Sequence, residues 1–144
     1  KKEVIKPLPI LLLNSDIFWI DHKISPITII LKQWNPAQME ILLCLKDKKE
    51  FVGYHGNGDF NIQNENQYPS LVIQNSLSPK YVFTGLQIIN SNLISDIKKE
   101  KFSIRELFLP LIKKKKIFGF PDTNQWFHFT SPKDYYKISK DLNK

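Results

Sequence analysis

Two short apolar runs, Ile10–Leu13 and Met39–Leu45, the second interrupted only by Glu40, limit most strongly what this chain can fold into. Continuous apolar character over so few residues is typical of a strand buried on both faces of a parallel sheet. Between the runs, residues 25–34 begin with Ser25-Pro26 and then place apolar side chains three and four positions apart, which predicts a capped helix. Strand, helix and strand in this order predict an α/β protein in which helices cover the sheet.

The middle of the chain adds further strands. Residues 60–63 and 71–74 are predicted to form a hairpin around a polar connection. Tyr81–Ile89 is rich in aromatic and β-branched residues and is predicted to be the strongest strand. Gly85 interrupts it, and a glycine inside a strand often marks a place where another group approaches the backbone closely.

The last third predicts helices and two more strands. A helix is expected over residues 91–99, and a second one begins at Ser103, where Ser103 and Glu106 have the spacing of a capping box. Strands are expected over 117–120 and 125–129, before a final helix that opens at Ser131-Pro132. We therefore predict one α/β domain over residues 1–144, with a mixed, mostly parallel sheet flanked by helices.

Composition narrows the class of partner. The net charge is +7, but Arg105 is the only arginine among 21 basic residues. Sequence readers of nucleic acid depend on the guanidinium group, so we favour a solvated lysine-rich surface and keep a basic nucleic-acid-binding module as a weaker alternative. No apolar stretch approaches the length of a membrane span. The single cysteine, Cys44, lies in an apolar run and is expected to be a buried thiol, so a cytoplasmic protein with no membrane partner is predicted.

Three polar clusters could carry chemistry. The first is Asn14-Ser15-Asp16, directly after the first predicted strand, where ligands of α/β proteins bind. Asp16 could hold Mg²⁺, which prefers oxygen ligands and often takes only one or two from protein. The alternative is that Asp16 starts a turn.

The other two clusters lie later in the chain. Gly58 and Asp59 belong to the segment Gly56–Phe60, which could bring backbone amides to a ligand or form a simple turn. Trp126 and His128 precede a predicted helix start, where His128 is a ligand, an acid–base group, or simply a packed or hydrogen-bonded residue between aromatics. None of these clusters is decisive by itself.

Taken in order, five stretches resemble the sugar-1-phosphate nucleotidyltransferases, in particular the branch of mannose-1-phosphate guanylyltransferase and N-acetylmuramate-1-phosphate uridylyltransferase. The stretches are Ile10–Asp16, Gly56–Phe60, Tyr81–Ile89, Phe102–Leu107 and Trp126–Pro132. The resemblance implies a Rossmann-like nucleotidyltransferase fold of which the N-terminal nucleotide-binding portion is missing.

The resemblance also implies an activity. In this family a sugar 1-phosphate oxygen attacks the α-phosphorus of a nucleoside triphosphate, giving nucleotide-sugar and pyrophosphate with Mg²⁺ as cofactor. By resemblance Asp16 would be the catalytic metal ligand, and the residues implied in binding substrate are Asn14, Gly58, Asp59, Thr84, Gly85, Trp126 and His128.

The chain departs from the family at two points. The family's Gly-rich loop with Arg and Lys, which binds the nucleotide, is not found among the five glycines of this sequence. Where the family commonly has a second acidic metal ligand, this chain has His128, and imidazole is a poor ligand for Mg²⁺.

These departures lead to two expectations. The chain is expected to be inactive alone, with a separate nucleotide-binding polypeptide completing the enzyme, and to be marginally stable or to form homo-oligomers because its first strand is an uncovered edge. The alternative is a non-catalytic sugar-phosphate-binding or regulatory subunit.

Overall fold

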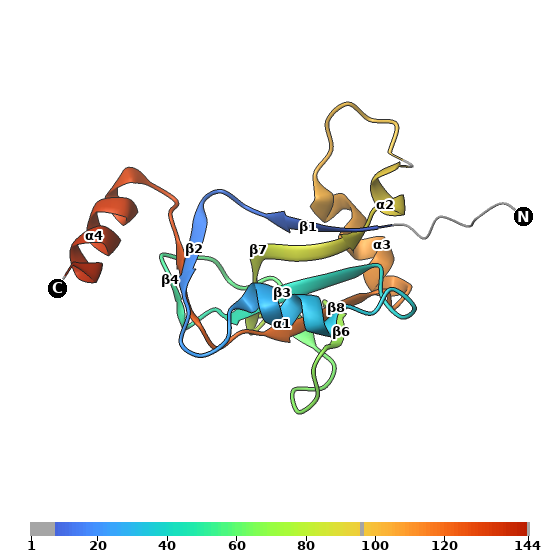
Figure 1. Cartoon of the computed structure of the whole chain (residues 1–144), viewed down its shortest axis with the longest axis horizontal. Helices are drawn as coiled ribbons and strands as arrows, with labels where there is room; N and C mark the ends of the chain where they lie inside the picture. Colours follow the sequence, from blue (N-terminus) through green and yellow to red (C-terminus); the bar gives the residue numbers. More distant parts are fainter. Residues whose placement is uncertain (1–7, 96, 144) are drawn as a thin grey trace, which may run out of the picture.

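A six-stranded mixed sheet forms the centre of the molecule, with strand order β1-β7-β3-β8-β6-β5, and a three-stranded sheet β2-β9-β4 lies beside it (Figure 1). The computed structural model describes residues 8–95 and 97–143. The strands are β1 (Pro9–Leu13), β2 (Ile17–Ile20), β3 (Ile41–Asp47), β4 (Phe51–Val52), β5 (Asn61–Ile62), β6 (Ser70–Ile73), β7 (Tyr81–Asn90), β8 (Ile117–Pro121) and β9 (Gln125–His128). The helical elements are α1 (Pro26–Gln33), α2 (Asn92–Ser95), the 3-10 turn η1 (Ile104–Leu107), α3 (Phe108–Lys113) and α4 (Pro132–Leu142).

Strand direction corrects one prediction. The sheet is mixed, as expected, but it is not mostly parallel: in the large sheet β3 and β8 pair in parallel, and the other neighbouring strands pair antiparallel. The chain does return through α1 so that β1 and β3 run in the same direction. However, β7 inserts between these two strands and pairs antiparallel with both. The sequence pattern around α1 therefore predicted the relative direction of β1 and β3 correctly. The insertion of β7 between them could not be predicted, because β7 is distant in sequence.

The first strand is a second correction. β1 lies at the edge of the large sheet, and its residues alternate between exposed and half-buried, so it is not buried on both faces. Ile10 and Leu12 pack into the core, whereas Leu11 and Leu13 remain 40% and 49% exposed. An apolar run indicates that a strand can be buried. Whether other strands and helices cover both of its faces depends on the tertiary structure.

Two apolar layers cover the two faces of the large sheet. On one face α2, η1 and α3 pack their apolar side chains against β3 and β7. On the other face α1 and the small sheet pack together, with Ile30 and Trp126 fully buried. Cys44 lies in this second layer, where burial raises the pKa of its thiol well above the ordinary value. The predicted buried cysteine is thus confirmed.

The helices follow the predicted start signals more closely than the predicted lengths. Helix α1 begins at Pro26 after Ser25, although Leu31 is exposed and does not join the core. The expected helix over 91–99, which includes residue 96 outside the described residues, is a short α2 that ends at Ser95. The capping box of Ser103 and Glu106 is present and opens η1.

In Figure 1, α4 lies beyond the small sheet, at the end of the molecule opposite α2 and α3. Within residues 8–95 and 97–143, no helix is both long and apolar enough to span a membrane.

Candidate functional site

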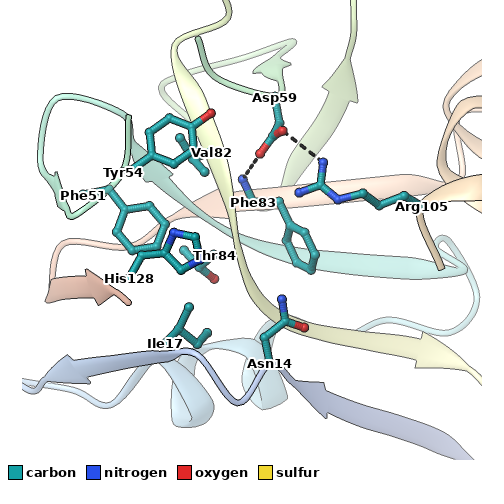
Figure 2. Close-up of a pocket in the computed structure, with 10 residues that line it drawn as sticks. All are labelled: Asn14, Ile17, Phe51, Tyr54, Asp59, Val82, Phe83, Thr84, Arg105 and His128. Carbon is teal, nitrogen blue, oxygen red and sulfur yellow. Dashed lines mark hydrogen bonds and ion pairs between the residues drawn. The ribbon is translucent and has the colours of Figure 1, made fainter. Parts of the chain in front are cut away.

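A cavity of about 100 Å³ lies where the large and small sheets meet (Figure 2). Complete ligand pockets usually measure ~300–1,000 Å³, so this one suits a single group of a larger substrate. The lining comes from both sheets and from η1. Its residues are Asn14, Ile17, Phe51, Tyr54, Asp59, Val82, Phe83, Thr84, Arg105 and His128.

Asp16 contacts His128, which lines this cavity, although Asp16 itself is not among the lining residues. Strands β2 and β9 pair with Ile17 opposite His128, and the Phe129 N–H donates to the Asp16 carbonyl at 2.9 Å. This register brings His128 Nε2 to 3.2 Å from Asp16 Oδ2, although 112 positions separate the two residues. The side chain of Asp16 is 51% exposed, so water and ligands can reach its carboxylate. The fold therefore brings two of the three polar clusters of the sequence into contact.

Asn14 and Gly85 contact each other directly. The Asn14 N–H donates to the Gly85 carbonyl at 3.1 Å, where β7 bulges relative to β3 and Gly85 has φ +96°. A Cβ at position 85 would lie 2.8 Å from Asn14 Cγ, which explains why this strand carries a glycine. The close approach predicted from the sequence is made by Asn14, while Gly85 itself is not among the lining residues.

Thr84 and Asp59 reach the cavity, but their polar atoms already have partners in the protein. The Thr84 hydroxyl donates to the Cys44 carbonyl at 3.0 Å. Asp59 Oδ2 accepts from the Phe83 N–H at 2.9 Å, and Asp59 Oδ1 accepts from Arg105 Nη1 at 3.1 Å (Figure 2). Gly58 lies next to this site with φ +94°, and its N–H donates to the Tyr54 hydroxyl. Thr84 and Asp59 therefore shape the cavity more than they offer polar atoms to it.

Trp126 lies elsewhere. Its indole is fully buried between the sheets, and Nε1 donates to Asp122 Oδ2 at 2.7 Å. The sequence placed Trp126 among the substrate-binding residues by resemblance, but the structure places it in the core. Trp126 and His128 are two positions apart on β9 and therefore share a face, and both rings contact Phe51. Trp126 lies deeper between the sheets, so its position in the core depends on packing and not on strand alternation.

Sequence reasoning missed six of the ten lining residues, of which Ile17, Val82 and Phe83 belong to strands β2 and β7. Phe51 and Tyr54 stack on each other and come from β4 and the turn after it, a segment for which the sequence analysis predicts no strand. Arg105 lies between the capping-box residues Ser103 and Glu106, a pattern that predicts a helix start and gives Arg105 no role in the site. The sequence carries two signals for Arg105: it is the single arginine of the chain, and it lies in the stretch Phe102–Leu107 that resembles the family.

The donor set around Asp16 tests whether Mg²⁺ fits. In the described residues no group of three or more His, Cys, Asp or Glu side chains is arranged to hold a metal. Asp16 contributes one accessible carboxylate, with an imidazole beside it. Mg²⁺ commonly binds through one or two carboxylates and completes its shell with water and substrate phosphates, so Asp16 fits such a site and His128 does not.

Known proteins resemble this chain in sequence and in fold. No family model matches the sequence. N-acetylmuramate alpha-1-phosphate uridylyltransferase of Caulobacter vibrioides is 23% identical over 124 residues, covering 86% of this chain. The chain spans 50% of that relative's length. This share fits the predicted resemblance to one half of a nucleotidyltransferase.

Solved structures agree on the fold. HddC from Yersinia pseudotuberculosis, solved in complex with GMP-PN, superposes with a TM-score of 0.61 at 16% identity, over 93% of this chain and 55% of that one. The inositol-1-phosphate CTP transferase of T. maritima gives a TM-score of 0.56 at 13% identity, over 98% of this chain and 58% of that one. The fold is a sugar-phosphate nucleotidyltransferase fold. The predicted resemblance and fold class are thereby confirmed, apart from the strand directions corrected above.

Proposed function

We propose that this chain binds a sugar 1-phosphate as the acceptor of a nucleotidyl transfer from GTP or UTP. The observation that supports the proposal best is the cavity between the two sheets, where Asn14, Thr84 and His128 meet in a nucleotidyltransferase fold. The name of the Caulobacter relative contains N-acetylmuramate α-1-phosphate, which is one sugar 1-phosphate of this class.

The proposed reaction requires mainly positioning and charge stabilisation. A phosphate oxygen of the acceptor attacks the α-phosphorus of the nucleoside triphosphate, the bond to the pyrophosphate group breaks, and pyrophosphate leaves. Asn14 and the β7 backbone around Gly85 would orient the sugar, and His128 would hold the Asp16 carboxylate in place through the contact at 3.2 Å. Asp16 would hold Mg²⁺, which supplies positive charge to the phosphates when bound.

The triphosphate needs a second binding element. Gly-rich loops bind phosphates through backbone N–H groups, and this sequence contains no such loop with an adjacent Arg and Lys. We propose that a nucleotide-binding polypeptide carrying that loop completes the enzyme. The described chain alone is then expected to bind the acceptor without releasing pyrophosphate.

Calorimetric titration tests the acceptor site. The wild-type chain should bind N-acetylmuramate 1-phosphate, N-acetylglucosamine 1-phosphate or mannose 1-phosphate in the presence of Mg²⁺. Asp16→Asn should weaken this binding by at least about tenfold, because the substitution removes the charge that retains the metal. Asp21→Asn, which alters another exposed aspartate, should leave the affinity unchanged.

Two outcomes would reject parts of the proposal. If the wild-type chain binds none of the three sugar phosphates at millimolar concentration, the acceptor site itself is wrong. If Asp16→Asn binds as tightly as wild type in Mg²⁺, Asp16 is not the metal ligand.

A non-catalytic sugar-phosphate-binding subunit is the second candidate. It is favoured by His128, which stands where an acidic metal ligand is common in the family. Binding of a sugar 1-phosphate without pyrophosphate release, even when the chain is co-expressed with the polypeptide encoded directly upstream, would favour this candidate over the enzyme.

A further inference from the structure

Arg105 reaches the cavity from a turn whose backbone is held on both sides. The Ser103 hydroxyl accepts from the Arg105 N–H at 3.3 Å, and Glu106 Oε1 accepts from the Ser103 N–H at 3.1 Å. From this turn the Arg105 side chain extends over the ring of Phe83, with Cζ 5.7 Å from the ring centre. The capping box fixes the backbone from which the side chain starts. Figure 2 shows the guanidinium group beside Asp59.

The carboxylate of Asp59 binds the guanidinium group of Arg105. Its side chain is 17% exposed, and its two oxygens are divided between the β7 backbone and Arg105. Because the Phe83 N–H fixes one oxygen, the other is presented to Arg105 in a defined direction. Asp59 thus orients Arg105 at the cavity and has little capacity left for a ligand of its own.

The guanidinium keeps donors for a ligand. Arginine carries five N–H donors in a rigid fork. Within residues 8–95 and 97–143, the structure gives the Arg105 guanidinium one hydrogen bond, from Nη1 to Asp59 at 3.1 Å. The Arg105 side chain is 54% exposed, so an incoming group can reach the remaining donors.

The residue type at this position is informative. Arg105 is the single arginine among 21 basic residues, and it lies at the cavity. Lysine suits a solvated surface, whereas the planar arginine fork suits phosphate and carboxylate oxygens. We propose that Arg105 binds an anionic oxygen group of the acceptor, either its phosphate or a carboxylate on its sugar. This inference rests on the proposed acceptor function and names the residue that selects for an anionic substrate.

Three probes separate the two anionic groups. N-acetylmuramate 1-phosphate carries a phosphate and a carboxylate, N-acetylglucosamine 1-phosphate carries the phosphate alone, and N-acetylmuramate carries the carboxylate alone. Each is titrated calorimetrically into the full chain as wild type, Arg105→Met, Arg105→Lys and Lys32→Met. Lys32→Met is the matched control, because it removes one exposed positive charge on α1, away from the cavity.

The Arg105→Met variant should weaken binding by about tenfold to a hundredfold, the range expected for charge-assisted hydrogen bonds. Arg105→Lys should recover part of this loss, since it restores the charge but not the fork. Lys32→Met should bind as wild type does. Asp59→Asn should lower the preference for N-acetylmuramate 1-phosphate over neutral N-acetylglucosamine, a ratio that loss of stability alone would not change.

Each outcome has a defined meaning. Equal losses for both sugar 1-phosphates support a phosphate contact, and a loss confined to the two probes with a carboxylate supports a carboxylate contact. If wild type binds a probe and Arg105→Met binds all three equally well, the role of Arg105 is overturned while the acceptor function stands. If wild type binds none of the probes, both proposals are overturned together.

Discussion

Gly85 shows at the scale of one residue how the backbone shapes the site. Its φ of +96° is a conformation that side chains with a Cβ rarely adopt, and it lies where β7 bulges toward the tip of β1. The same bulge directs Thr84 to the cavity, so a change at Gly85 affects stability and ligand binding together.

Gly85→Ala should lower the free energy of unfolding by roughly 1–3 kcal/mol, the cost of a strained backbone conformation. Urea denaturation followed by circular dichroism measures this change. Asn14→Ala alone should cost little, since Asn14 is exposed. The double variant should keep most of the Gly85→Ala penalty, because the positive φ remains. An unchanged unfolding midpoint for Gly85→Ala would contradict the described backbone.

At the scale of elements, a buried carboxylate holds β9 in place and with it His128. Asp122 is 4% exposed and accepts hydrogen bonds from the Asn124 backbone, the Asn124 amide and the Trp126 indole. Asn124 in turn accepts from the His22 N–H and donates to the Ile24 carbonyl, which ties the segment before α1 to β9. The position of His128 thus depends on polar contacts that lie outside the cavity.

Asp122→Ala should destabilise the protein by about 3 kcal/mol, because buried N–H donors lose their acceptor. Asp21→Ala provides a matched comparison, since Asp21 accepts from the Trp19 indole at 2.8 Å in an exposed position. This control should shift stability by no more than about 0.5 kcal/mol. Equal effects of the two substitutions in chemical denaturation would show that the Asp122 network is not a structural anchor.

At the scale of the whole molecule, β1 leaves an apolar edge open. The strand Pro9–Leu13 carries no charge, and its outer side has no partner strand among residues 8–95 and 97–143. Unprotected edges of this kind promote pairing between chains, which charged residues normally prevent. Self-association through β1 is therefore expected when no other polypeptide covers the edge.

Sedimentation velocity over a range of concentrations tests this expectation. The wild-type chain should associate as concentration rises, and Leu11→Lys should reduce association by placing a charge on the edge strand. Leu77→Lys is the control, because Leu77 is fully exposed in a loop far in sequence from β1. A wild-type chain that stays monomeric throughout, or that associates as strongly after Leu11→Lys, would argue against the edge as the interface.

The sequence by itself determined the features that depend on neighbouring residues. Apolar continuity located β3, and aromatic and β-branched content located β7. The Ser-Pro pair located the start of α1, and the spacing of Ser103 and Glu106 located the capping box of η1. Gly85 indicated that another group approaches the backbone of this strand closely, and that group is Asn14. These signals are local, because hydrogen-bonding patterns and side-chain periodicity extend over only a few positions.

The tertiary structure alone decided which distant segments meet. It placed β7 between β1 and β3, left β1 as an edge, and turned Trp126 into the core. It also brought Arg105 to Asp59 across 46 positions of sequence. Strand partners and side-chain contacts of this range follow from how whole layers pack, and no local pattern carries that information.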